Sequence, residues 1–306
     1  MVEVSVIIPT YNYGRFIGEA IKSVLSQSFR HLEIIIVDDG STDGTKDLVS
    51  TFKDPRLSYI YQKNRGSSSA RNIGIKIASG KYIGFLDADD LWMPEKLDLQ
   101  ISQFKSNPTV GLVYTGYEVI NTTGTCIATR IAQPIEGDLV AQLILGNIVS
   151  GSATTSLVQR ACFDQVGLFD ETLTSCEDWD MWLRIARISD FACIQQPLAR
   201  IRLHGNNLTY DPKRMENGLF SVVEKFYSDE SLPSELKRLE SKAMAAAHRD
   251  SANFYFRKGQ VKDAFNHLLK AIRLVPRWWE VYEIMGHIAF KMWLPNNPSN
   301  RLENHK

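Results

Sequence analysis

The apolar and polar positions of the first hundred residues alternate between two patterns. Short runs in which nearly every residue is apolar are separated by segments whose apolar residues recur at helical spacing. Uniformly apolar strands that alternate with helices are typical of a parallel sheet with helices on both faces. The predicted strands cover residues 2–9, 32–39, 57–62 and 81–87, and the predicted helices cover residues 15–27, 45–52 and 68–78, with Pro94 and Glu95 opening the next helix.

The pattern changes twice further along the chain. Residues 108–205 hold shorter apolar runs, and past residue 212 all apolar spacing is helical. We therefore predict an α/β domain over residues 1–211, with halves at about 1–107 and 108–211, and an all-helical extension over residues 212–306. In the second half, the patterns predict strands at 110–120, 151–159 and 191–203 and a helix at 177–188.

The extension contains a segment, at about residues 245–276, that fits a single tetratricopeptide-like helical hairpin. Small and apolar residues stand at the offsets that let two helices cross closely. A lone repeat cannot bury its own apolar face, so another element must cover it, and residues 278–294 are the obvious candidate. The positions that fit the repeat are Ala252, Tyr255, Gly259, Ala264, Leu268, Ala271 and Pro276.

Composition and charge narrow the classes of function. The 306 residues include 35 Lys and Arg against 35 Asp and Glu, so no net field attracts nucleic acid, and we expect no nucleic-acid partner. The four cysteines have no C-x-x-C spacing, which fits a reduced, cytoplasmic compartment without a zinc site. No signal-peptide pattern opens the chain, and no apolar run of about 18 residues predicts a membrane span.

Three predicted strands end in polar clusters, at residues 9–12, 38–41 and 87–90. The carboxyl ends of parallel strands meet at one edge of a sheet, so these clusters are expected to converge. Neither a G-x-G-x-x-G turn nor a phosphate-binding loop is present. Asp87 and Asp89 alternate along an extended segment, so both can face one hard cation such as Mg²⁺ or Mn²⁺. Taken alone, the pair is weak evidence of a metal site, and a solvated turn with a helix cap ahead of Pro94 is the favoured interpretation.

The pair is not alone. In order, the chain contains VSVIIPTYN, IIIVDDGSTDGT, NRGSSSARNIGI, GFLDADDLW and VGLFDETLTSCEDWDMWLRIA. Together these segments resemble the inverting glycosyltransferases of family 2, which have the GT-A fold, a Rossmann-like and mostly parallel sheet flanked by helices. The resemblance covers about residues 1–210 and leaves the helical extension unexplained.

The resemblance implies a nucleotide-sugar site at the strand ends. Asp39 matches the residue that accepts the N–H of the base, while Asp38 either shares this role or caps the glycine turn. Arg71 matches a basic residue near the nucleotide, although an ion pair on the helix surface is the alternative. Asp90 is read as a cap of the next helix. The nucleotide-sugar-binding residues implied in this way are Pro9, Thr10, Tyr11, Asp39, Arg71, Asp87 and Ala88, and the implied metal ligands are Asp89, Asp87 and His204.

The resemblance also implies a catalytic base. Asp178 matches it, with Glu177 as the fallback, and both open the helix predicted at 177–188. A helix N-terminus stabilises a carboxylate, so we expect Asp178 to be ionised at neutral pH. Trp179 and Trp182 either border the acceptor site or lie in the core, and Trp182 is read as core. Arg202 is a candidate to neutralise phosphate charge.

The reaction implied by the resemblance moves a sugar from a nucleotide diphosphate, a UDP-sugar by preference, to an acceptor hydroxyl. The expected cofactor is Mn²⁺ or Mg²⁺, and the acceptor is a saccharide or a lipid-linked saccharide, as in surface polysaccharide synthesis. The alternative is a non-catalytic sugar-nucleotide-binding or scaffold protein that acts through its helical C-terminus. A nucleotidyltransferase would need a glycine- and lysine-rich loop after the first strand, which PTYNYGRFIG is not.

Residues 257–294 leave one more alternative open. Within 278–294, the polar residues Glu280, Glu283, His287 and Lys291 form one narrow helical stripe, and nearly all other positions are apolar or small. This segment either packs on the hairpin and the α/β domain or rests on the anionic inner face of a membrane as a peripheral contact. Just upstream, residues 257–277 contain several basic residues and a single acidic residue, Asp263. The basic residues are Arg257, Lys258, Lys262, Lys270, Arg273 and Arg277.

Overall fold

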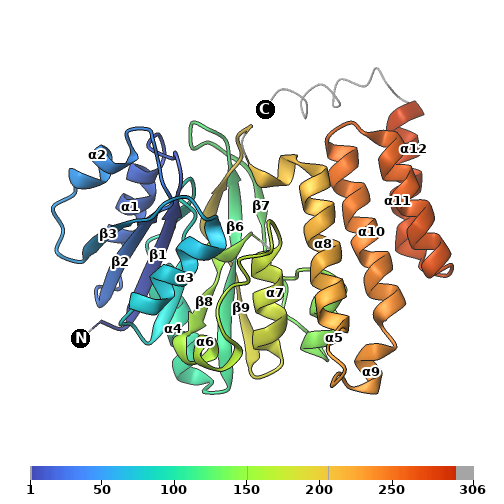
Figure 1. Ribbon diagram of the computed structural model, residues 1–306, viewed down its shortest axis with the longest axis horizontal. Coiled ribbons are helices and arrows are strands. Elements are labelled where there is room, and N and C mark those ends of the chain that lie inside the picture. The colour runs from blue at the N-terminus through green and yellow to red at the C-terminus, as the bar shows by residue number, and fades with distance from the viewer. Residues whose placement is uncertain (1, 150, 206, 294–306) are drawn as a thin grey trace. The chain divides into compact units, whose positions relative to one another are not determined.

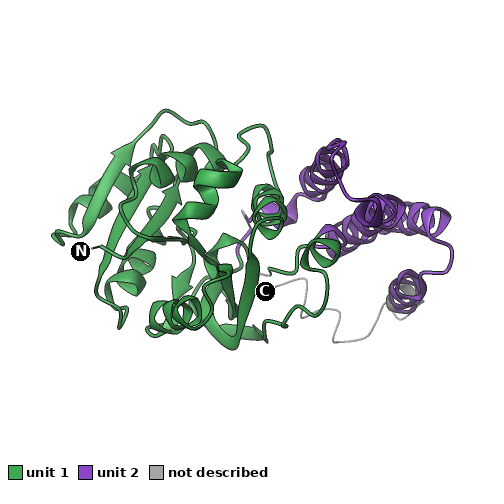
Figure 2. Ribbon diagram, turned by 90° about the horizontal axis from the view of Figure 1, so that it is seen from below, with its two compact units in different colours: residues 1–143, 147–203 green, residues 144–146, 204–306 purple. Residues whose placement is uncertain are grey.

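The computed structural model describes residues 2–149, 151–205 and 207–293. The chain divides into two compact units, which are described one by one (Figure 2). The first unit holds residues 1–143 and 147–203, and the second holds residues 144–146 and 204–306. The domain boundaries expected from the sequence stay a prediction.

The first half of the first unit forms the parallel sheet that the sequence predicts (Figure 1). Strands β1 to β4 run parallel, with β1 between β2 and β4 and with β3 outside β2. The apolar residues of β1, β2 and β4 are buried because helices pack on both faces, whereas those of the edge strand β3 are half-buried or exposed. The elements are β1 Val4–Thr10, α1 Ile17–Leu25, β2 Leu32–Asp38, α2 Thr45–Ser50, β3 Leu57–Tyr61, α3 Ser67–Ile77 and β4 Tyr82–Phe85.

The second half adds strands of both directions to the same sheet. The strand order is β3-β2-β1-β4-β8-β6-β9-β5, and β7 also pairs with β6. Strand β8 is antiparallel to both β4 and β6, so β6 and its parallel neighbour β9 run in the direction of β4. The elements are β5 Leu91–Trp92, α4 Lys96–Ser106, β6 Val110–Ile120, β7 Cys126–Arg130, α5 Leu139–Ile144, η1 Ala153–Thr155, β8 Leu157–Gln159, α6 Arg160–Val166, α7 Glu177–Ala186 and β9 Asp190–Arg202.

Several predicted elements need correction here. The strand expected at 151–159 is a 3₁₀ turn followed by the three-residue strand β8, because Ser152 caps the turn by accepting a bond from the main-chain N–H of Thr154. Helix α4 begins at Lys96 rather than at Pro94. The short elements β5, β7, α5 and α6 were not predicted from the sequence.

The sheet has its switch point between β1 and β4. The chain leaves β1 toward β2 and β3 on one side and returns to place β4 on the other side. In such sheets ligands bind outside the carboxyl ends of the strands at the point of reversal. Helix α3 lies close to β1 here, because a Cβ atom at Gly74 would stand only 2.5 Å from Cγ2 of Ile7. The topology therefore places the residues after β1 and β4 beside the start of α3.

The second unit is helical, as the sequence predicts. In α10 and α11 the hairpin positions Ala252, Tyr255, Ala264, Leu268 and Ala271 are buried, and Val281 and Ile288 of α12 pack on the same cluster. None of the described helices is both long and apolar enough to cross a membrane. The elements are η2 Leu208–Tyr210, α8 Pro212–Tyr227, α9 Ser234–Lys237, α10 Glu240–Arg257, α11 Val261–Leu274 and α12 Trp279–Trp293.

Candidate active site

The loops after β1 and β2 bond to each other. Asn12 has a positive φ of 59°, and its main-chain N–H donates to Oγ of Ser41 over 2.9 Å. Its Oδ1 accepts from the main-chain N–H of Thr42 over 2.8 Å. Two of the three polar clusters therefore meet at the sheet edge, as the parallel strands predict. We call residues 10–12, 38–41 and 87–90 the polar rim.

Asp38 closes the turn after β2. Its side chain is fully buried, and Oδ1 accepts from the main-chain N–H of Ser41 over 2.7 Å. The hydroxyl of Tyr59 donates to Oδ2 over 2.6 Å. Of the two roles left open by the sequence, the structure supports the cap of the glycine turn.

Asp39 organises the loop that leads into α3. Its Oδ1 accepts from Nε2 of Gln62 over 2.6 Å and from the main-chain N–H of Arg65 over 2.7 Å. Its Oδ2 accepts from the main-chain N–H of Gly66 over 2.8 Å. A carboxylate oxygen accepts two bonds, so Oδ2 retains acceptor capacity toward a ligand. The base-binding role of Asp39 stays a prediction.

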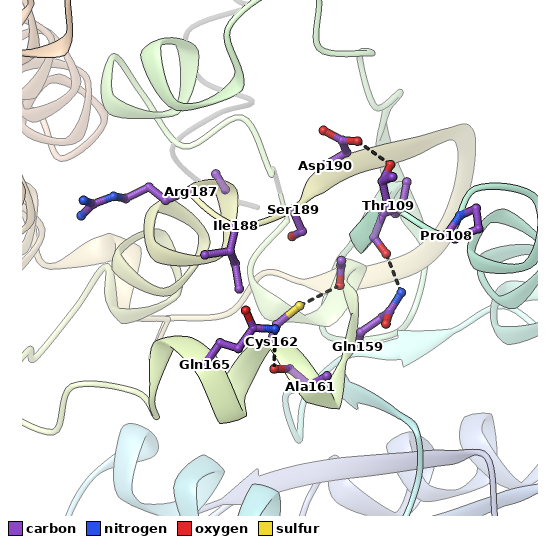
Figure 3. Close-up of a pocket in the computed structure, with 13 residues that line it drawn as sticks. Pro108, Thr109, Gln159, Ala161, Cys162, Gln165, Arg187, Ile188, Ser189 and Asp190 are labelled. Carbon is purple, nitrogen blue, oxygen red and sulfur yellow. Dashed lines mark hydrogen bonds between the residues drawn. The ribbon is translucent and has the colours of Figure 1, made fainter. Parts of the chain in front are cut away.

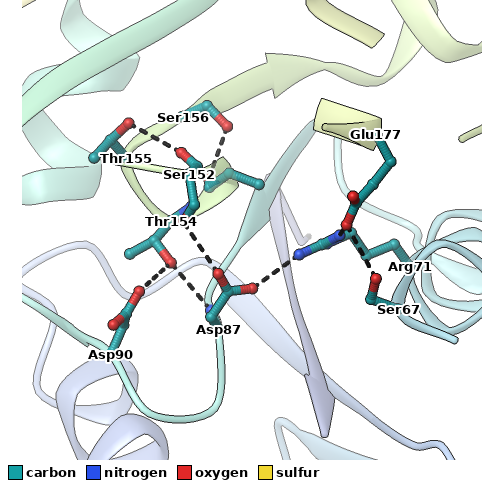
Figure 4. Close-up of polar contacts among 10 residues, drawn as sticks. Ser67, Arg71, Asp87, Asp90, Ser152, Thr154, Thr155, Ser156 and Glu177 are labelled. Carbon is teal, nitrogen blue, oxygen red and sulfur yellow. Dashed lines mark hydrogen bonds and ion pairs between the residues drawn. The ribbon is translucent and has the colours of Figure 1, made fainter. Parts of the chain in front are cut away.

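Arg71 joins two distant acidic residues (Figure 4). Its Nη1 donates to Oε1 of Glu177 over 2.6 Å, and its Nη2 donates to Oδ1 of Asp87 over 2.9 Å. Burial acts to lower the pKa of Arg71, but the charges of Asp87 and Glu177 outweigh it and raise the pKa. With 6% of its surface exposed, Arg71 forms a buried bridge rather than the pair on the helix surface considered from the sequence.

A second group of contacts holds the segment after β4. Oγ of Ser152 donates to Oδ2 of Asp87 over 3.0 Å, and the main-chain N–H of Asp87 donates to Oγ1 of Thr154 over 3.1 Å. The same Thr154 hydroxyl donates to Oδ2 of Asp90 over 2.8 Å (Figure 4). Asp90 therefore does not cap α4, whose first turn receives no side-chain cap. No sequence pattern pointed to Ser152 or Thr154.

Arg202 binds the same segment from the end of β9. Its main-chain N–H donates to Oδ1 of Asp90, and its Nε donates to the main-chain oxygen of Asp89. Its Nη2 donates to Oε2 of Glu19 over 2.7 Å, and its Nη1 donates to two main-chain carbonyls. In this arrangement the guanidinium fixes the acidic segment from inside the protein, whereas the sequence suggested that it contacts phosphate.

Negative charge is concentrated around Asp87 and Asp89. Burial first, and then the charges of Asp89 and Asp87, raise the pKa of Asp90 well above its usual range. Burial and the same carboxylates raise the pKa of the Tyr13 hydroxyl. In the part of the chain that the structure describes, no three His, Cys, Asp or Glu side chains converge as a complete metal site. Two carboxylates fit a Mg²⁺ or Mn²⁺ ion whose remaining ligands are water and substrate phosphate.

Glu177 and Asp178 begin α7, after Cys176 in a left-handed conformation (φ 60°). Burial acts to raise the pKa of Glu177, but Arg71 outweighs it and lowers the pKa, helped by a bond from Oγ of Ser67. Burial, and then the charge of Glu177, raise the pKa of Asp178 to about 6. Burial and the charge of Glu177 therefore outweigh the stabilisation that the helix N-terminus offers the carboxylate. At neutral pH Asp178 is still mostly ionised, and its pKa suits a general base.

The other predicted residues lie in different settings. Thr10 is buried and its Oγ1 has no hydrogen-bond partner among the described residues, whereas Tyr11 is 46% exposed. Trp179 and Trp182 are both buried, so neither indole presents a face to an acceptor. Pro9 lies in β1 and Ala88 is buried in the apolar core beside the polar rim.

His204 begins the second stretch of the helical unit, and its metal-binding role stays a prediction.

A concavity of about 550 Å³ lies elsewhere in the first unit (Figure 3). It is lined by the starts of β6 and β9 and by α6, including Thr109, Gln159, Cys162 and Asp190. Because β6 and β9 run in the direction of β4, their starts lie at the sheet edge opposite the polar rim. The acidic residues and this concavity therefore do not belong to one site, and we assign the candidate active site to the polar rim.

This chain is similar to known proteins in both sequence and fold. The model of the family described as glycosyl transferase family 2 matches residues 5–167. An "Uncharacterized glycosyltransferase" of Rickettsia felis is 36% identical over 229 residues, which are 74% of this chain and 37% of that relative. The chain thus spans little more than a third of that protein. The Bacillus subtilis "Putative teichuronic acid biosynthesis glycosyltransferase TuaG" is 33% identical over 67% of this chain and 81% of its own.

Two solved structures share the fold at low sequence identity. S. aureus TarS in complex with UDP-GlcNAc has a TM-score of 0.68 at 19% identity, over 90% of this chain and 82% of its own. The mannosyltransferase PcManGT from Pyrobaculum calidifontis, in complex with GDP-Man and Mn²⁺, has a TM-score of 0.65 at 18% identity. That match covers 99% of this chain and 84% of PcManGT. Both likenesses bear on the fold alone.

Proposed function

Because the chain belongs to glycosyl transferase family 2, we propose that it transfers a sugar from a nucleotide diphosphate to an acceptor hydroxyl with inversion of configuration. The observation that carries this proposal is the bridge from Asp87 through Arg71 to Glu177, which brings the end of β4 next to the start of α7. A donor-binding carboxylate and a base with a raised pKa then lie on either side of one guanidinium.

We take the donor to be a UDP-sugar. Thr10 and Asp39 lie at the ends of the neighbouring strands β1 and β2, where a nucleoside would bind. The buried hydroxyl of Thr10 lacks a partner among the described residues, and Oδ2 of Asp39 has acceptor capacity. The UDP-GlcNAc complex of TarS supports this donor class, and the name of TuaG supports a role in surface polysaccharide synthesis.

The acceptor is then a saccharide or a lipid-linked saccharide. A cytoplasmic location fits four cysteines that form no disulfide.

In the proposed reaction Asp178 accepts the proton of the acceptor hydroxyl. The acceptor oxygen forms a bond to the anomeric carbon, and the bond from that carbon to the diphosphate breaks, so the electron pair leaves with the nucleoside diphosphate. Attack on the face opposite the leaving group converts an α-linked donor into a β-glycoside. Asp87 and Asp89 would hold a divalent cation, which would neutralise charge on the leaving diphosphate. The Mn²⁺ in PcManGT supports such a cation.

Substitution of the base separates chemistry from binding. Asp178→Asn keeps the shape of the side chain but removes the proton acceptor, so we expect a loss of transfer of about 10²- to 10⁴-fold. Binding of UDP with Mn²⁺, measured by calorimetry, should stay within a few fold of the native protein. Asp47→Asn, at an exposed position of α2, is the matched control. Transfer by Asp178→Asn at the native rate would remove Asp178 from the mechanism.

The donor site has its own test. Asp89→Ala should abolish the part of UDP binding that depends on Mn²⁺, and unchanged binding would contradict the metal assignment. The alternative of a non-catalytic binding protein predicts that UDP-sugar is bound but never consumed. Slow release of UDP from a UDP-sugar with Mn²⁺, absent in Asp178→Asn, favours the enzyme.

A further inference from the structure

One face of α12 carries large aromatic side chains in contact with solvent. Trp279 is 71% exposed, Tyr282 is 38% exposed and Phe290 is 58% exposed. Their spacing of three and eight residues places them on one side of the helix, and we call them the aromatic stripe. Val281 and Ile288, on another side, are buried against the α10–α11 hairpin. The helix therefore packs on the hairpin through one face and leaves a second apolar face uncovered by described residues.

The stripe begins at the turn between α11 and α12, where its side chains are held in place. The hydroxyl of Tyr282 donates to the main-chain oxygen of Pro276 over 2.9 Å, and Nε1 of Trp279 donates to Oε1 of Glu283 over 2.8 Å. The Trp279 and Tyr282 rings lie 6.3 Å apart. Leu274, the last residue of α11, is 41% exposed beside them. Ordered, exposed apolar groups at such a turn indicate an interaction surface.

Basic residues lie at the end of α11 and in the turn that follows it. Arg273 and Arg277 are both exposed and flank Leu274 at close sequence distance. Among the acidic residues nearby, Glu280 lies 3.3 Å from Arg249 and is already paired. The exposed basic residues at the end of α11 and in the turn are Lys270, Arg273 and Arg277, and the exposed acidic residues at the start of α12 are Glu280 and Glu283. Arg257, Lys258, Lys262 and Asp263 lie at the other end of α11. This excess of basic over acidic residues is local, because the whole chain carries equal numbers of basic and acidic residues.

We propose that the aromatic stripe and the α11–α12 turn bind an anionic lipid surface, with α12 lying in the headgroup region as a peripheral contact. Trp and Tyr favour the boundary between headgroups and acyl chains, where the apolar ring and the polar edge are both satisfied. Lys and Arg near the surface add attraction to anionic lipids. A second copy of this chain would present the same positive charge to the turn, so the charge favours lipid over self-association.

Flotation of the full-length protein tests the proposal. We expect the protein to float with vesicles of phosphatidylcholine and phosphatidylglycerol, and to stay at the bottom with vesicles of phosphatidylcholine alone. Added salt should reduce the binding, because the attraction between exposed charges is screened. Failure to float with the anionic vesicles, or equal flotation with both kinds, would overturn the proposal.

Two variants locate the contact. Trp279→Ser with Phe290→Ser should reduce partitioning by about a hundredfold or more, since two aromatic rings no longer enter the interface. Arg273→Glu with Arg277→Glu should have a similar effect. Ile127→Ser in β7 and Lys46→Glu in α2, both at exposed positions, are the matched controls and should float as the native protein does. Native flotation of both turn variants would also overturn the proposal.

Light scattering after size-exclusion chromatography tests whether the aromatic stripe instead binds a second copy of this chain. A dimer that disappears in Trp279→Ser with Phe290→Ser, together with no flotation, would assign the stripe to self-association instead. Circular dichroism and thermal unfolding of every variant show that each is folded. The proposal is independent of the proposed function, because flotation needs neither donor nor transfer, and either can fail alone.

Discussion

Two adjacent carboxylates at the start of α7 have opposite electrostatic settings. Glu177 bonds to Arg71 and Ser67, and its pKa is lowered although it is buried. Among the described residues, Asp178 has no such partner for its charge beyond the next main-chain N–H, at Trp179, and its pKa rises to about 6. A group with a lowered pKa is a weak proton acceptor, so the geometry favours Asp178 over Glu177 as the base.

The raised pKa of Asp178 has a consequence for stability. The folded protein holds this proton more tightly than the unfolded chain, so the contribution of Asp178 to the free energy of unfolding should fall as the pH rises between about pH 4 and pH 6. Asp178→Asn cannot ionise, and above pH 6 it should be more stable than the native protein by about 1–3 kcal/mol. The groups that set this shift are Glu177, Arg71 and Asp87.

Thermal unfolding of the metal-free protein across this range measures the difference. Asp47→Asn should follow the native curve, since this side chain is exposed. A variant at Asp178 that is less stable than the native protein at pH 8 would contradict the raised pKa. The same ionisation should give transfer activity an acid limb near pH 6.

At the scale of elements, α3 is the support of the site. It carries Ser67 at its start and Arg71 one turn later, and both bond to Glu177. Its distance from β1 is set by Gly74, which contacts Ile7 where any Cβ atom would clash. Strand β1 and helix α3 therefore move together, and a shift of α3 would displace the bridge between Asp87 and Glu177.

A larger residue at position 74 should destabilise the protein. In an exposed helix Gly→Ala is stabilising by about 0.5–1 kcal/mol. At Gly74 the added methyl would lie 2.5 Å from Cγ2 of the buried Ile7, and overpacking of this kind costs about 1–3 kcal/mol. Gly74→Ala should therefore lower the unfolding midpoint in urea.

Gly286→Ala is the matched control. This glycine is also helical, in α12, and no atom of the described residues lies within 4 Å of the position that the added methyl would occupy. The substitution should leave the midpoint unchanged or raise it slightly. Equal effects of the two substitutions would show that α3 can move away from β1 at little cost.

At the scale of the molecule, the site is assembled from segments spread over most of the first unit. Residues after β1, β2 and β4 supply the polar rim, α3 supplies Arg71, and α7 supplies Asp178. The α10–α11 hairpin has a core of its own, in which Ala252, Ala264 and Leu268 are buried. A nucleotide at the proposed site should therefore act on the first unit selectively.

Hydrogen exchange can measure this selectivity. On addition of UDP and Mn²⁺ we expect slower exchange in peptides that cover residues 10–14, 38–43, 64–71 and 87–90, because a bound ligand suppresses local opening. Peptides from the interior of α10 and α11 should exchange as before. Protection confined to the concavity at the starts of β6 and β9 would place the nucleotide there instead.

The sequence was most informative where one periodicity continues for a whole element. Strands β1 to β4 were predicted nearly in place, because uniformly apolar runs between helices have a single reading. Strand β5 has two residues and exists through its pairing with β9, so its own sequence holds no signal. The direction of β8 likewise depends on β4 and β6.

The candidate site likewise has a part that the sequence predicts and a part that depends on distant partners. The acidic residues stand in motifs, and their meeting at the sheet edge follows from parallel strands. Ser67, Ser152 and Thr154 are small polar residues without a pattern, and only their distant partners give them a role. The pKa of Asp178 could not be predicted from its place at a helix N-terminus, because it depends on burial and on the neighbouring charge of Glu177.

The contacts of Arg202 bear on the order in which a ribosome delivers this chain. Glu19 is synthesised 183 residues before the arginine that pairs with it, and Asp90 precedes the same arginine by 112 residues. Domains assemble while translation proceeds from the N-terminus. The parallel strands β1 to β4 are therefore made long before the acidic segment receives its last support, and the nascent protein should hold Asp89 and Asp90 in place only after β9 has emerged.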